Sequence, residues 1–112
     1  MTLEPNQADR KVVVTDTARY KGYRMYQPWR LREIVGDMST HGLHLLHRKG
    51  TNEYLLRTKK GTGHQVETII IAFAVTDDAL VVITQMHEHQ NYFKDPDYEQ
   101  VEIHSFCTES EI

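Results

Sequence analysis

Cysteine is nearly absent from this chain, because Cys107 is the only one among 112 residues. A single thiol excludes an internal disulfide framework and any zinc site built on several cysteines. Long apolar runs are also missing. The longest, residues 69–75, has seven residues, whereas a membrane-spanning helix needs about 20. Residues 1–9 are polar and lack the apolar stretch of a signal peptide. We therefore expect a cytoplasmic protein without membrane contact, in which Cys107 is a small packing residue.

Each half of the chain is poor in charge of one sign. Residues 10–60 contain twelve Lys and Arg against four Asp and Glu, whereas residues 61–112 contain one Lys against ten acids. The net charge of −3 therefore hides a basic half and an acidic half. Two interpretations follow: the basic half binds an anionic partner, or the fold brings the two halves together so that they neutralise each other.

The first part of the chain predicts two strands and one helix. Residues 11–15 and 19–26 have the composition of strands. Pro28 suits the first turn of a helix, and Gly42 is placed to end it. Apolar residues between them recur at the spacing of one helical face, namely Leu31, Ile34, Val35 and Met38. We therefore expect one principal amphipathic helix.

Four apolar segments separated by short turns follow the helix, at residues 43–48, 53–60, 66–76 and 79–89. This spacing predicts an antiparallel meander. The third segment is apolar on both faces. We expect the helix to cover one face, and either the C-terminal segment or a second copy of the chain, in a homodimer, to cover the other. Residues 101–106 predict a further strand, with a short helix as the alternative.

These elements predict one α+β domain over residues 1–112. Its principal amphipathic helix packs on a mainly antiparallel sheet of four to six strands. We expect residues 1–9 and 107–112 to be flexible ends.

Alternate turns of a meander lie at the same end of the sheet, so five of the seven histidines should gather at one end. These five are His41, His44, His64, His87 and His89. Three of them, His64, His87 and His89, have the nitrogen ligands for a metal ion. However, the spacing His-x-His is common and is not diagnostic. We therefore predict solvated histidines, with no metal and no cofactor.

Metal-independent cleavage of RNA is an alternative chemistry for the same end of the sheet. His64 and His87 would act as the acid–base pair, as catalytic residues. Anion binding by Arg57, Lys59 and Lys60 would stabilise the charged phosphate.

The helix followed by four antiparallel strands, with a last strand reading ALVVITQMHE, resembles the small RelE/ParE-type toxin domains. The resemblance covers residues 28–90 and rests on the order of elements, not on a motif. It implies a ribosome-dependent endoribonuclease, or a relative that has lost this activity. Those toxins are usually strongly basic, whereas this chain is acidic overall. No catalytic residue is carried over from them.

The segment ARYKGYRMYQPWRLR combines cations with large aromatic side chains. Residues 19–32 contain five Lys and Arg, four Tyr and Trp, and no acid. Aromatic rings stack on bases while cations bind phosphates, and protein interfaces also favour aromatic residues and Arg. Trp29 fits a core position in the first turn of the helix. The predicted partner-binding residues are Arg19, Tyr20, Lys21, Tyr23, Arg24, Tyr26 and Arg30.

We therefore expect a small, non-enzymatic binding or regulatory protein. It would dock on an acidic protein surface or on RNA through residues 19–32. The small size, the lack of a cofactor motif and the charge split suit an accessory factor such as those carried by phages or mobile elements. The alternative is the small ribonuclease of toxin type.

Overall fold

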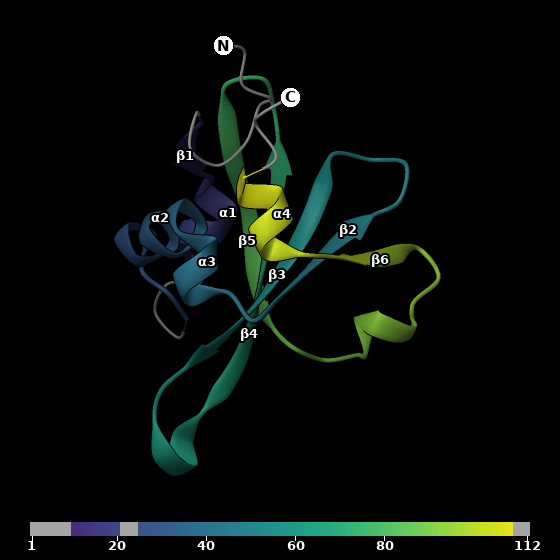
Figure 1. Ribbon diagram of the computed structural model, residues 1–112. Coiled ribbons are helices and arrows are strands. Elements are labelled where there is room, and N and C mark those ends of the chain that lie inside the picture. The colour runs from purple at the N-terminus through teal and green to yellow at the C-terminus, as the bar shows by residue number, and fades with distance from the viewer. Residues whose placement is uncertain (1–9, 21–24, 109–112) are drawn as a thin grey trace.

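A computed structural model describes residues 10–20 and 25–108 of the chain (Figure 1). Six strands form one sheet in the order β1-β5-β4-β3-β2-β6. Their bounds are β1 Lys11–Val14, β2 His44–Arg48, β3 Glu53–Lys60, β4 Glu67–Val75, β5 Ala79–His87 and β6 Tyr98–Val101. The predicted antiparallel meander is confirmed for β2 to β5. At the two edges, β6 pairs antiparallel with β2, and β1 pairs parallel with β5.

Several short helices take the place of the one principal helix that we expected. They are α1 Asp16–Tyr20, α2 Pro28–Gly36, α3 Met38–His41 and α4 Ile103–Thr108, with 3-10 turns η3 Gly63–Gln65 and η4 Tyr92–Lys94. The predicted apolar stripe is buried, but Asp37 (φ −142°) separates α2 from α3. Glycine and aspartate are poor helix formers, and the Asp37 N–H turns back to the Ile34 carbonyl at 3.2 Å.

The predicted strand at residues 19–26 is wrong where the structure describes it. Asp16–Tyr20 is the helix α1, residues 25–27 belong to no regular element, and residues 21–24 lie outside the described residues. Thr15 begins the helix, because its hydroxyl accepts a hydrogen bond from the Ala18 N–H at 3.4 Å. This is the usual bond of an N-cap residue.

The C-terminal prediction also needs correction. A strand was expected at residues 101–106, but β6 ends at Val101 and α4 follows. Cys107 belongs to α4 and packs against the core, as expected of a small packing residue, and the flexibility of residues 107–112 stays a prediction. Residues 1–9 and 109–112 lie outside the described residues.

Two clusters of buried residues cover the two faces of β4. Side chains from all four helices pack on one face, around Phe73 and Ile71. On the other face, Tyr92 of η4 packs over Ile70, with Tyr98 of β6 beside it. Part of the cover thus comes from the segment after β5, and the homodimer stays a prediction. Within the described ranges, no helix is long and apolar enough to cross a membrane.

A β-bulge in β5 changes which residues face the helices. Ala72 pairs with Thr84 and Phe73 pairs with Val82, so Ile83 is an extra residue in β5. Because side chains alternate along a strand, one extra residue exchanges the two faces beyond it. Val82 before the bulge and Gln85 after it therefore both point toward the helices.

Candidate functional site: a basic groove beside Trp29

The buried side chain of Gln85 fixes the segment that leads into α2. It is 0% exposed. Its carbonyl oxygen accepts a hydrogen bond from the Tyr26 N–H at 2.9 Å, and its amide nitrogen donates to the Tyr26 carbonyl at 2.8 Å. The same nitrogen lies 3.1 Å from the Ala18 carbonyl of α1. The Gln85 side-chain amide thus bonds the Tyr26 backbone as a neighbouring strand would. These bonds fix the position of the chain just before α2.

Tyr26 is a core residue, although we predicted it to contact a partner. Its side chain is 4% exposed, and its hydroxyl lies 2.8 Å from the Thr58 hydroxyl of β3, which donates to the Ile69 carbonyl. Burial raises the pKa of Tyr26 above its ordinary value. The tyrosine therefore ties the start of α2 to β3.

Trp29 is exposed, although we expected it in the core at the first turn of the helix. The side chain is 65% exposed, whereas Leu31, two residues later, is fully buried. At about 100° per residue, two positions are separated by about 200° around a helix. The indole therefore points away from the face that packs on the sheet.

A groove of about 550 Å³ runs between the start of α2 and the end of β3. We call it the Trp29 groove. Its lining residues are Met25, Tyr26, Gln27, Trp29, Arg30, Lys59, Lys60 and Gly61. None of these described residues is an acid, and three of them are cations. Two sequence predictions meet here, because Arg30 comes from the basic aromatic segment and Lys59 and Lys60 come from the predicted anion-binding set.

The electrostatics of the Trp29 groove favour an anion. Arg30 forms an ion pair with Glu33 on the surface of α2, and such exposed pairs are weak enough to be exchanged for another anion. The first turn of α2 holds no acid, and no side chain caps it at Gln27. The positive end of the helix dipole therefore adds to the field of the lysines.

A second cavity adjoins the first at the turn between β3 and β4. It measures about 590 Å³ and shares Lys60 and Gly61 with the Trp29 groove. Its other lining residues are Thr62, His64, Gln65, Val66 and Glu67. Figure 1 shows the β3–β4 hairpin projecting from the body of the molecule. The two cavities together make a polar surface that extends onto this projecting hairpin.

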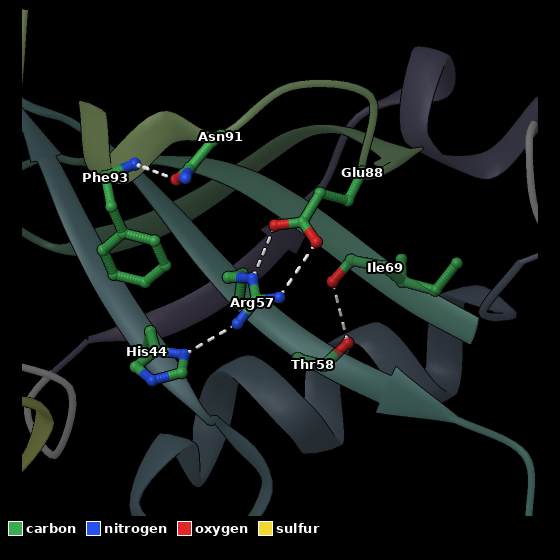
Figure 2. Close-up of polar contacts among 7 residues, drawn as sticks. All are labelled: His44, Arg57, Thr58, Ile69, Glu88, Asn91 and Phe93. Atoms are coloured by element: carbon green, nitrogen blue, oxygen red, sulfur yellow. Dashed lines mark hydrogen bonds and ion pairs between the residues drawn. The ribbon is translucent and has the colours of Figure 1, made fainter. Parts of the chain in front are cut away.

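Arg57 does not line the Trp29 groove, and Figure 2 shows it hydrogen-bonded to Glu88 and His44. Its guanidinium forms a bidentate pair with Glu88, at 2.6 and 2.9 Å, and donates to His44 Nδ1 at 2.9 Å. The Phe93 ring lies 5.6 Å from the guanidinium carbon. The Glu88 hydrogen bonds raise the pKa of Arg57, and Arg57 lowers the pKa of Glu88. This pair joins the basic and acidic halves of the chain, so our anion-binding prediction gains no support at Arg57.

The five histidines expected at one end have separate contacts instead of a common site. His44 contacts Arg57, His87 pairs with Glu67 at 3.2 Å, and the His89 ring packs against Tyr92. His64 lies exposed in η3, and His41 ends α3. β3 and β4 pair beyond the end of β5, as far as Lys60 and Glu67, so His64 in the hairpin turn lies past the end of the strand that carries His87.

The candidate metal ligands His64, His87 and His89 do not form a metal site. Among residues 10–20 and 25–108, no group of three or more His, Cys, Asp or Glu side chains is arranged to hold a metal ion. The pairing of His87 with Glu67 uses one imidazole that such a site would need.

The remaining predicted partner-binding residues are only partly described. Arg19 is exposed on α1, and its Nε lies 3.4 Å from the Val14 carbonyl. Tyr20 ends α1, but its side chain lies outside the described part of the chain, as do Lys21, Tyr23 and Arg24. Of the predicted partner-binding residues that the structure describes, Arg30 lines the Trp29 groove and has an accessible side chain.

Sequence reasoning missed the roles of Gln85 and Trp29. The helical position of Trp29, outside the apolar stripe, was a usable signal for its exposure. No signal pointed to Gln85, because its direction depends on the bulge at Ile83.

In the comparisons with known proteins, no protein family, curated protein or solved structure matches this chain.

Proposed function

We propose that this chain is a non-enzymatic binding protein that docks an anionic macromolecule in the Trp29 groove. One observation carries the proposal: three cationic residues and an exposed tryptophan line a groove whose described lining contains no carboxylate. Arg30, Lys59 and Lys60 supply the positive charge. Concave surfaces lined by one sign of charge concentrate ligands of the opposite sign.

Because the chain is acidic overall, we expect it to attract an anionic partner only at the Trp29 groove. With a net charge of −3, the molecule as a whole repels polyanions, so a partner is attracted where the cations gather. Two of the remaining cations are paired with carboxylates. Arg57 is paired with Glu88, and Arg48 lies 3.5 Å from Glu53. Lys59 and Lys60 are therefore the cations that we expect to dominate docking.

The ribonuclease alternative has weaker geometric support. His87 pairs with Glu67 and does not belong to the lining of the hairpin cavity, whereas His64 does. An acid–base pair needs both groups within reach of one substrate. We therefore propose binding without RNA cleavage.

Heparin and poly-glutamate, two unrelated polyanions, test the proposal. The variant Lys59→Gln/Lys60→Gln should bind both more weakly, and its salt dependence should be shallower by about 0.7–0.9 for each lysine that contacts the polyanion. Lys11→Gln/Lys49→Gln is the matched control, because it removes the same charge from exposed positions outside the groove. Equal losses in the two variants, or no polyanion binding at low salt, would refute docking in the Trp29 groove.

A further inference from the structure

The exposure of Trp29 is not explained by the charge of the groove. Trp29 is the only tryptophan in the chain, and its side chain is mostly exposed. Phe93, another exposed aromatic residue, contacts the His44 ring and the Arg57 guanidinium. In the described part of the chain, by contrast, no aromatic ring or cation stacks on Trp29. The indole thus presents an open aromatic face at the edge of a cationic groove.

The neighbours of this face favour a nucleic acid over a protein. Protein interfaces are depleted in lysine and enriched in arginine, whereas two lysines, Lys59 and Lys60 at the end of β3, line the Trp29 groove. Single-stranded nucleic acids are bound by cations that follow the backbone together with aromatic rings on which bases stack. The groove holds both components within one concave surface.

The path of the groove also suits a strand. Through Lys60 and Gly61 it continues into the hairpin cavity, where Thr62, His64 and Gln65 are exposed hydrogen-bonding residues. The lining of that cavity also includes the carboxylate of Glu67, which is paired with His87. We therefore expect a linear polyanion to be bound mainly where the two cavities adjoin, at Lys60 and Gly61. A duplex keeps its bases stacked inside, so it cannot place one on Trp29 without unstacking.

We propose that the occupant of the Trp29 groove is a single-stranded nucleic acid. A base stacks on the Trp29 indole, and the neighbouring phosphates bind Lys59 and Lys60. This inference rests on the proposed docking of an anionic macromolecule and names its chemical class. RNA and DNA share the chemistry, since either provides bases and phosphates. Recognition is expected to tolerate sequence, because every base has an aromatic face.

The single tryptophan makes the test direct. Short oligouridylate and oligodeoxythymidylate strands should quench the fluorescence of the wild-type protein, since stacking brings the base onto its only indole. Anisotropy of labelled strands then compares variants. Trp29→Leu should weaken single-strand binding by about 5- to 150-fold, the range that loss of one stacked base produces. Heparin binding should change by less than about twofold, and Trp29→Phe should restore most of the single-strand affinity.

Phe93→Leu is the matched control, because Phe93 is also an exposed aromatic residue but lies outside the groove. It should leave single-strand affinity unchanged. A preference for the RNA or the DNA strand would identify the source of the ligand, and equal affinity would support the shared chemistry. Equal binding of duplex and single strand, or unchanged single-strand affinity in Trp29→Leu, would overturn base stacking.

The two proposals fail in different ways. Binding of heparin without binding of either single strand would leave the cationic groove as a docking site for anions, and would point to an acidic protein surface as its occupant. If none of the polyanions binds the protein, both proposals are refuted. Circular dichroism and melting of Trp29→Leu verify that the variant is folded before either conclusion is drawn.

Discussion

The side-chain amide of Gln85 pairs with both the N–H and the carbonyl of Tyr26, at 2.9 and 2.8 Å. A glutamine in β5 thereby holds a segment that is 59 residues distant in sequence. Both partners are buried, so the pairing replaces hydrogen bonds that water would otherwise supply. It also places Trp29, three residues after Tyr26, at the edge of the groove.

Replacing Gln85 by alanine should therefore be costly. The change leaves the Tyr26 N–H and carbonyl buried without this partner, and each such group costs about 1–3 kcal/mol. We expect the free energy of unfolding in urea to fall by about 2–4 kcal/mol. Trp29 fluorescence should shift as well, because the start of α2 is released. Gln100→Ala, at an exposed position of β6, should stay within about 0.5 kcal/mol of wild type. A similar small effect of Gln85→Ala would contradict the anchoring role.

Trp29→Ala should leave the free energy of unfolding nearly unchanged, within about 1 kcal/mol, because the exposed indole contributes little buried area. Phe73→Ala, at a fully buried position, should cost about 3–5 kcal/mol. Chemical denaturation of both variants, followed by circular dichroism, measures the contrast. A loss above about 2 kcal/mol in Trp29→Ala would show that the indole is part of the core, and the stacking proposal would lose its basis.

The Arg57–Glu88 pair should make stability depend on pH. Arg57 lowers the folded-state pKa of Glu88 below its ordinary value of 4.5. The Glu88 carboxylate therefore binds a proton more readily in the unfolded state than in the folded state. Its contribution to the stability of the folded state is complete above pH 4.5 and is lost as the pH falls through the lower folded-state pKa. The difference in unfolding free energy between wild type and Glu88→Gln should therefore be constant near neutral pH and shrink in acid.

Arg57→Met supplies the complementary measurement. It leaves Glu88 without its charged partner, and at neutral pH we expect a loss of about 1–3 kcal/mol, the range for hydrogen bonds to charged groups. The double variant Arg57→Met/Glu88→Gln should be more stable than the sum of the two single losses implies. Additive losses would mean that the pair contributes little, as exposed pairs often do.

Two glycines of the β3–β4 hairpin should respond differently to alanine. Both have positive φ, 99° at Gly61 and 63° at Gly63, so either substitution costs about 1 kcal/mol of backbone strain. A Cβ at Gly61 would also lie 2.2 Å from the Gln65 carbonyl oxygen, whereas one at Gly63 meets nothing within 4 Å. Gly61→Ala should therefore lower the melting temperature clearly more than Gly63→Ala. Because Gly61 lines both cavities, the Gly61→Ala substitution should also weaken polyanion binding. Equal melting temperatures would show that the close approach of Gly61 to Gln65 does not limit the turn.

Local patterns predicted most of the sheet. Glycine and aspartate turns separate β2 to β5, and the alternation of side chains identifies each strand. The stripe from Leu31 to Met38 also predicted which residues are buried. It could not reveal the break at Asp37, because the apolar positions on α2 and α3 stay in phase across it. The strand expected at residues 19–26 is wrong at its start, because Thr15 caps the helix α1 and the composition of this segment does not reveal that cap.

The candidate site was predictable only in its parts. Lys59, Lys60 and Arg30 were named from charge, but their meeting in one groove depends on how α2 is placed against β3. That placement relies on Gln85 and Tyr26, which meet across the fold. Arg57 carries the same charge as its neighbours, yet Glu88 and His44 engage it. Long-range pairing of this kind leaves no mark in a local window of sequence.

The parallel pairing of β1 with β5 also sets an order of assembly during synthesis. Lys11 leaves the ribosome 68 residues before its partner Ala79. At about 5–20 residues per second, β1 waits roughly 3 to 14 s for the strand that will hold it. In that interval the β2–β3 and β3–β4 hairpins, whose strands are near neighbours in sequence, have all their residues available. The pairing that fixes β1 in the sheet can therefore form only after β5 has been synthesised.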